Sequence, residues 1–188
     1  MPQTFGIAII PSGPDFHGGK MIQLNHQQSE EKFKKESFPE RKISFFLCGV
    51  SDWRNIAGVR RLADAIATNK IFLDSKSFKV FQKYEKKIIR AGRQDSAEFE
   101  AIENPIEFLK EISGQKIAVE ITSQSQSIFD FKNAGEETLL LVGNEQHGVS
   151  EEILNEIEIH LHVPMLGVGS SMNVAMALGI ASYELLFR

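Results

Sequence analysis

Short apolar runs alternate with helical patterns along most of this chain, and no other feature constrains its fold as strongly. Strands are predicted at residues 43–50, 71–73, 98–102, 116–122, 138–143 and 159–164, helices at 55–67, 105–113, 150–157 and 173–187, and a basic helix or loop at 81–93. The first of these strands is a continuous run of β-formers, which is typical of a strand buried on both faces. The alternation predicts an α/β domain with a mostly parallel sheet flanked by helices.

The N-terminal part of the chain has a different character. Residues 4–10 are apolar and are followed by Pro11, which predicts a short strand and a turn, and residues 28–37 favour one helical piece. A chain of 188 residues is long enough for one domain with a short appendage. We therefore expect an N-terminal extension at residues 1–42 and one main domain at residues 43–188.

Composition excludes several classes of protein. The single cysteine, Cys48, rules out an intrachain disulfide and a cysteine-based zinc site. No apolar run approaches the roughly 20 residues that span a bilayer, so we expect no membrane partner. A secretory signal has a basic segment before its apolar stretch, and the N-terminus of this chain has none, so we expect no secretory signal. These features together predict a cytoplasmic protein.

Charge is divided unevenly between the two halves of the chain. Residues 1–94 hold 17 of the 21 Lys and Arg residues but only 9 of the 25 acidic residues. Because local charge decides where a polyanion can bind, the basic half predicts a surface for one, although chance segregation explains the asymmetry equally well. The basic segment from Lys79 to Arg93 could likewise be a solvated face.

In a parallel sheet, ligands bind outside the carboxyl ends of the strands, so the candidate binding loops are those after Val50, Val142 and Val163. Each loop combines polar side chains with glycines, which permit a close approach of the backbone to a ligand. None contains a P-loop, a Gly-x-Gly-x-x-Gly fingerprint or a nucleophile elbow. His160 and His162 alternate on one strand face, but no third ligand stands at a diagnostic spacing, so we expect no metal.

Taken in order, the three loops resemble motifs 1, 2 and 3 of the SpoU (TrmH-like) RNA ribose 2′-O-methyltransferases of the SPOUT superfamily. Motif 1 runs from Asn55 over five residues to Arg61 and then to small and acidic residues. Motif 2, a Gly-x-Glu-x-x-Gly-x-Ser pattern after an apolar strand, is matched by residues 143–150. Motif 3, a strand ending in Ile-Pro-Met that leads to Ser-Leu-Asn at the start of the last helix, is matched by residues 163–173.

The match departs from the family in two small ways. Met172 replaces the usual Leu of motif 3, which conserves volume, and Leu62 stands where Thr is common in motif 1. Neither change removes a polar group with a catalytic role. The resemblance covers residues 43–188, whereas the first 40 residues match no motif of the family.

The resemblance implies a fold, a cofactor and an activity. The C-terminal segment of the sheet would form a deep trefoil knot, with S-adenosyl-L-methionine bound in the knot loops and a homodimer formed through the knot region. The reaction would move a methyl group to a ribose 2′-hydroxyl in tRNA or rRNA. The closing helix is apolar on more than one side, which fits both a dimer contact and a buried core helix.

The resemblance also implies roles for single residues. Arg61 would contact the hydroxyl or its neighbouring phosphate, and Asn55 would orient that loop. Glu145 and Asn173 would hold the arginine and the methionine end of the cofactor, with Ser171 assisting. Because arginine stays protonated in proteins, an electrostatic clamp is preferred to a general base.

The residues expected to hold the cofactor are Gly143, Asn144, Val163, Pro164, Met165, Gly167 and Met172. The residues expected to contact RNA are Arg54, Arg60, Lys83, Lys86, Lys87, Arg90 and Arg93.

Simpler interpretations stay open beside these roles. Asn55 could be a plain helix cap, and Ser150 is expected to be one. Glu145 alone would be an ordinary surface acid, and Ser171 and Asn173 could merely start the last helix. As a whole, the chain could be a non-catalytic RNA-binding or assembly module that retains the fold, or a nucleotide-binding α/β enzyme without a knot.

Overall fold

The computed structural model describes residues 23–33, 40–92, 97–132, 134–169 and 171–187. The chain divides into two compact units, residues 1–38 and residues 39–188. In the first unit, helix α1 (His26–Phe33) overlaps the helical piece predicted at 28–37. It begins where the Asn25 side chain accepts a hydrogen bond from the N–H of Gln28 at 2.9 Å. The strand predicted at residues 4–10 lies outside the described residues.

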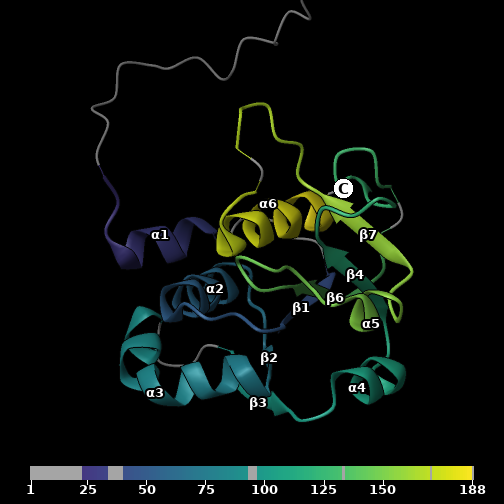
Figure 1. Cartoon of the computed structure of the whole chain (residues 1–188). Helices are drawn as coiled ribbons and strands as arrows, with labels where there is room; N and C mark the ends of the chain where they lie inside the picture. The colour runs from purple at the N-terminus through teal and green to yellow at the C-terminus, as the bar shows by residue number, and fades with distance from the viewer. Residues whose placement is uncertain (1–22, 34–39, 93–96, 133, 170, 188) are drawn as a thin grey trace, which may run out of the picture. The chain divides into compact units, whose positions relative to one another are not determined.

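A seven-stranded sheet forms the centre of the second unit (Figure 1). Its strands are β1 (Lys42–Leu47), β2 (Lys70–Asp74), β3 (Glu98–Ile102), β4 (Gln115–Val119), β5 (Gln126–Ser127), β6 (Glu137–Val142) and β7 (Ile159–His162). They are arranged in the order β3-β2-β1-β6-β4-β7-β5, and every pairing between them is parallel. The predicted α/β domain with a mostly parallel sheet is confirmed. The two-residue strand β5 was not predicted, because it is too short to carry an apolar pattern.

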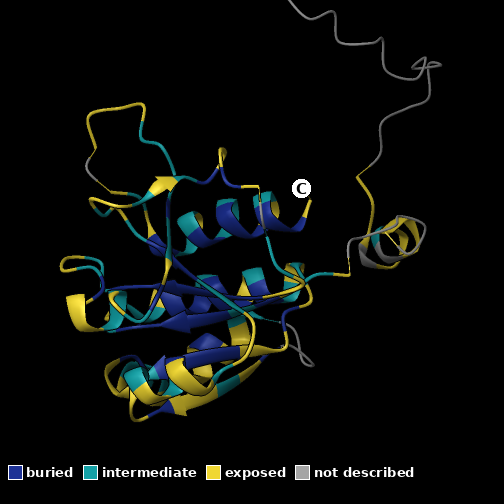
Figure 2. Ribbon diagram, turned by 90° about the vertical axis from the view of Figure 1, so that its right-hand side faces the viewer, coloured by how far each residue is buried: buried dark blue, intermediate teal, exposed yellow. Residues whose placement is uncertain are grey.

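Helices cover both faces of this sheet. They are α2 (Trp53–Ala65), α3 (Ser75–Ala91), α4 (Pro105–Glu111), α5 (Glu151–Leu154) and α6 (Val174–Leu186). Side chains of β1 alternate between two apolar clusters: Phe45 and Leu47 pack with α2, α3 and α6, whereas Phe46 packs with α4 and α5. Figure 2 shows the central strands as a buried layer between these helices. Among the described residues, no helix is long and apolar enough to cross a membrane.

Local side-chain bonds decide where the helices begin. Asn104 caps α4, because its side chain accepts a hydrogen bond from the N–H of Glu107 at 3.3 Å. Helix α2 begins before Asn55, because Asp52 is its cap and accepts a hydrogen bond from the N–H of Arg54 at 2.9 Å. Ser150 is the N-cap residue of α5, as expected, although its side chain makes no capping hydrogen bond.

The parallel arrangement brings the loops after β1, β6, β4 and β7 to one edge, since these strands are consecutive in the sheet. The end of β1 is fixed by the fully buried Ser77, whose hydroxyl donates to the carbonyl of Leu47 at 3.0 Å and accepts from the N–H of Val50 at 2.9 Å. Leaving such a buried group unpaired costs about 1–3 kcal/mol. The loop after β1 therefore starts from a well-defined position at this edge.

Candidate active site

The carboxylate of Glu145, in the loop after β6, accepts hydrogen bonds from the loop after β1. Its Oε1 accepts from the Asn55 side chain at 2.7 Å and from the N–H of Asp52 at 3.2 Å. Its Oε2 accepts from the hydroxyl of Ser51 at 2.9 Å and from the N–H of the same residue at 3.2 Å. Hydrogen bonds to a charged acceptor are stronger than neutral ones. Glu145 therefore ties two loops together and is not an ordinary surface acid.

Asn55 extends this link to the third loop. Because its Nδ2 donates to the carboxylate, its Oδ1 accepts from the Nδ2 of Asn173 at 2.8 Å. The Oδ1 of Asn173 in turn accepts from the N–H groups of Ala175 and Met176, at 3.0 and 3.3 Å, and so caps α6. Each donor meets an acceptor, which fixes the orientation of both amides. We call Glu145, Asn55 and Asn173 the inter-loop chain.

The pKa of Glu145 reflects these contacts. Burial raises this pKa, but hydrogen bonds from Asn55, from Ser51 and from its own N–H lower it by more, so that the pKa lies below the usual value of a glutamate. A carboxylate with a lowered pKa stabilises the fold above its unfolded-state pKa and loses this effect as the pH falls through its folded-state pKa. Glu145 is thus an anionic anchor at neutral pH.

The loop after β6 is a tight turn organised by Asn144. Its backbone N–H and carbonyl both bond to Gly148, at 3.0 and 2.9 Å, and its side-chain oxygen accepts from the N–H groups of Gln146 and His147, at 2.9 and 3.1 Å. A Cβ atom at Gly143 would collide with the backbone of Gly148. This turn therefore requires glycine at position 143 to close.

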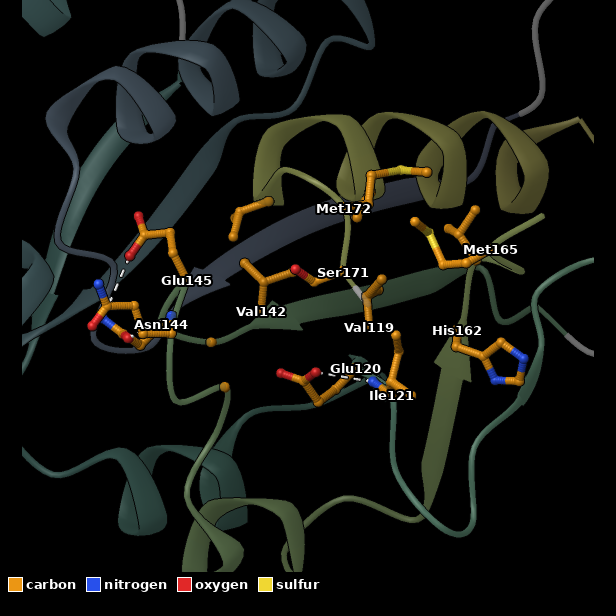
Figure 3. A pocket seen from close by; sticks show the side chains of 16 residues that line it. Val119, Glu120, Ile121, Val142, Asn144, Glu145, His162, Met165, Ser171 and Met172 are labelled. Atoms are coloured by element: carbon orange, nitrogen blue, oxygen red, sulfur yellow. Dashed lines mark hydrogen bonds between the residues drawn. The ribbon is translucent and has the colours of Figure 1, made fainter. Parts of the chain in front are cut away.

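These loops enclose a cavity of about 300 Å³ at the carboxyl ends of β4, β6 and β7 (Figure 3). Of the residues predicted to hold a cofactor, those that line it are Gly143, Asn144, Val163, Met165 and Met172. Of the residues predicted to be catalytic, Glu145 and Ser171 line it. Pro164 and Gly167 are not among the lining residues. The cavity thus joins the second and third predicted loops, and the inter-loop chain adds the first.

The arginines of α2 lie in different environments. Arg61 is exposed and does not line the cavity. Arg54 is also exposed and pairs with Asp52 at 3.0 Å. Arg60 was expected to face solvent or RNA, and this is wrong: its side chain is 5% exposed and donates to the carbonyl of Ala97 at 3.2 Å. Arg60 therefore links α2 to the start of β3 and is not available to RNA.

A basic surface lies on α3, next to the first loop. Four exposed cations in the second half of this helix, Lys83, Lys86, Lys87 and Arg90, form what we call the basic face of α3. The Lys87 ammonium lies 5.1 Å from the ring centre of Trp53, and the Lys83 ammonium lies 5.3 Å from that of Tyr84. The two rings stack on each other at 5.7 Å, at the point where Tyr84 interrupts the helical backbone. Cation–π contacts of this kind restrict where the ammonium groups lie. Arg93 lies outside the described residues.

The wall of the cavity that follows β4 was not predicted from the sequence. Strand β4 ends at Val119, whereas the predicted strand continues to residue 122, so that Glu120 and Ile121 begin a loop and line the cavity. The sequence did contain a signal for this wall, because the residues that follow a parallel strand must lie at the same edge of the sheet as those that follow its neighbours. His162 also lines the cavity, and its Nδ1 lies 3.0 Å from the hydroxyl of Ser125.

The fold and the cavity define this protein as an α/β protein with a ligand site at the carboxyl edge of its sheet. It belongs to the SpoU rRNA Methylase family, whose family model matches residues 42–183. This result confirms the resemblance drawn from the three motifs.

Relatives of known activity share this part of the chain. The tRNA (guanosine(18)-2′-O)-methyltransferase of Aquifex aeolicus is 27% identical over 150 residues, which cover 77% of this chain and 69% of that enzyme. The 23S rRNA (guanosine(2553)-2′-O)-methyltransferase RlmP of Bacillus subtilis is 25% identical over 154 residues, which cover 78% of this chain and 61% of that enzyme. The solved structure of the A. aeolicus TrmH/SpoU tRNA modifying enzyme superposes with a TM-score of 0.62 at 25% identity, over 83% of this chain and 81% of that one.

Replacing Glu145 by Gln tests the inter-loop chain. Gln has one side-chain oxygen and one NH₂, so an amide donor would face the donors of Asn55 or Ser51. We expect a loss of about 1–3 kcal/mol of unfolding free energy at neutral pH. The difference from the wild type should shrink as the pH falls through the lowered pKa of Glu145, because the wild-type carboxyl is then also neutral. Urea unfolding across acid to neutral pH measures this. Glu158→Gln, at an exposed position, is the matched control, and a pH-independent difference would contradict the prediction.

Proposed function

We propose that this protein binds S-adenosyl-L-methionine in the cavity and transfers its methyl group to a ribose 2′-hydroxyl of tRNA or rRNA. The inter-loop chain is the observation that carries the proposal, because it joins the three motif loops beside one cavity. Membership of the SpoU rRNA Methylase family supports it, as do relatives named for ribose 2′-O-methylation of tRNA and of 23S rRNA.

The cavity suits this cofactor in shape and chemistry. Val142, Val163 and Met172 offer apolar surface to the flat adenine ring, and the backbone at Gly143 can approach the ligand closely. When bound, the cofactor supplies a methyl group on a positively charged sulfur. Pro164 and Gly167 lie on the same loop as Met165 and would act through the shape of that loop. The residues that line the cavity would orient this cofactor and exclude water from it.

Arg61 is proposed to act on the RNA. It lies on the exposed side of α2, the helix whose first turn holds Asn55 of the inter-loop chain. An arginine remains protonated at working pH, so its guanidinium can grip a phosphate and stabilise the negative charge that develops on the 2′-oxygen. In this role Arg61 is an electrostatic clamp, while Asn55, Glu145, Ser171 and Asn173 position the loops around the reacting groups.

Replacing Arg61 by Ala should reduce methyl transfer to RNA by about a hundredfold or more, because removing one donor from a developing oxyanion has an effect of this size. Unfolding free energy and binding of S-adenosyl-L-methionine should stay close to the wild type, since the side chain is exposed. Transfer of a radiolabelled methyl group to total RNA from cells lacking the protein measures the effect. Lys70→Ala, another exposed cation at the opposite edge of the sheet, is the matched control.

A fully active Arg61→Ala variant would contradict the role of this residue. If the wild type binds the cofactor but methylates no RNA, the non-catalytic RNA-binding module becomes the better description.

RNA contact is assigned to the basic face of α3 and to Arg54. The cations are exposed, and two of them lie against the Trp53–Tyr84 stack. Trp53 begins α2, two residues before Asn55. Cations fixed in this way lose less conformational entropy when they bind phosphates. The basic face would thus hold the RNA backbone while the cavity side of the loops meets the ribose.

A Lys83→Ala, Lys87→Ala double variant should bind RNA more weakly, and the slope of log K against log salt should become shallower by about two. Fluorescence anisotropy with labelled RNA over a range of salt concentrations measures this slope. The control is the Lys110→Ala, Lys132→Ala double variant, which loses the same charge at exposed positions outside α3. This variant should leave the slope unchanged. An unchanged slope in the α3 variant would remove these lysines from the RNA interface.

Two further features are proposed with the family assignment. The first is a deep trefoil knot at the C-terminal end, which an experimental structure would contradict if the last helix passed through no loop of backbone. The second is a homodimer formed through this region, supported by three exposed large side chains on or next to α6: Met176, Tyr183 and Phe187. Light scattering that gave the mass of one chain would contradict the dimer.

A further inference from the structure

Glu120 places an incompletely bonded carboxylate in the wall of the cavity. Its Oε1 accepts a hydrogen bond from the N–H of Ile121 at 2.9 Å. A Cβ atom at Gly148 would lie 2.8 Å from its Oε2, so the glycine leaves space for this oxygen. Figure 3 shows the Glu120 carboxylate at the cavity wall, on the side of β4. Among the described residues, no hydrogen bond reaches Oε2, which is therefore free to interact with a ligand.

The second carboxylate of the wall, that of Glu145, differs in this respect. Both of its oxygens accept hydrogen bonds from the loop after β1, so they are occupied by the protein. The residues that line the cavity include these two acids and no Lys or Arg. The wall is thus negative, and Glu120 is the acid with capacity left for a ligand.

We propose that Glu120 makes the cavity select the positively charged methyl donor over the neutral product. This inference rests on the proposed function. S-adenosyl-L-methionine carries one net positive charge, from its sulfonium, its ammonium and its carboxylate. In the transfer, the bond between sulfur and methyl breaks, the bond between methyl and the 2′-oxygen forms, and the hydroxyl proton leaves to solvent. The sulfur keeps the electron pair and becomes a neutral thioether in S-adenosylhomocysteine.

The size of the effect follows from Coulomb's law. Two unit charges about 4 Å apart attract each other least at the bulk-water limit, and this lower limit sets the size of the effect expected here. This corresponds to roughly a five- to tenfold difference in affinity. The attraction is present for the donor and absent for the product, so that the product is released more readily.

Glu120→Gln tests the proposal, because glutamine keeps an oxygen for the N–H of Ile121 and removes only the charge. Isothermal titration calorimetry with the purified full chain gives Kd for S-adenosyl-L-methionine, S-adenosylhomocysteine and sinefungin, an analogue with an ammonium group near the position of the sulfonium. We expect the variant to bind the two cationic ligands about five- to tenfold more weakly and the neutral product less than twofold more weakly. Glu136→Gln, the same change on an exposed residue at the opposite end of β6, should change none of the three values.

The outcomes separate the inference from the proposed function. If Glu120→Gln weakens all three ligands equally, or none of them, charge selection by Glu120 is overturned while cofactor binding stands. If the wild type binds none of the three ligands, the proposed cofactor and the inference are both overturned. Circular dichroism of each variant before titration confirms that the comparison is between folded proteins.

Discussion

The site depends on the carboxylate of Glu145 and on the free energy that it costs to remove this charge from water. A partly buried acid is stable as an anion only if hydrogen-bond donors replace the water it has lost. Here the donors come from Ser51, Asp52 and Asn55, which follow a different strand. The need to satisfy one charge therefore fixes the distance between two loops that are about ninety residues apart in the sequence.

The inter-loop chain also has a direction, and this direction couples the cavity to the last helix. It begins at an anion, passes through two amides whose orientation is forced, and ends on the N–H groups of α6. A shift of α6 would leave a buried amide of Asn55 unpaired, which is costly in a low-dielectric interior. Val163, Met165, Ser171 and Met172, which lie between β7 and α6, line the cavity, and the inter-loop chain fixes the α6 end of this segment.

The sequence predicted those parts of the fold that rest on local patterns. The apolar runs gave the central strands, and the three loops were found because polar residues and glycines follow strand ends. Contacts between distant segments could not be predicted from local patterns. Arg60 has the sequence context of a surface cation, but it is buried and donates to the carbonyl of Ala97. The cap of α2 is Asp52 and not Asn55. Glu120 was missed because the end of β4 was placed too late, which assigned a cavity residue to a strand.

A double-mutant cycle on Glu145→Gln and Asn173→Ala tests the central claim most directly, since these residues lie at the two ends of the inter-loop chain and are connected through Asn55. The measured quantities are the unfolding free energy and the Kd for S-adenosyl-L-methionine in the wild type, both single variants and the double variant. If the chain acts as a unit, the two changes will not add, and the coupling will be about 1 kcal/mol or more in both quantities. Strict additivity in both would contradict the account.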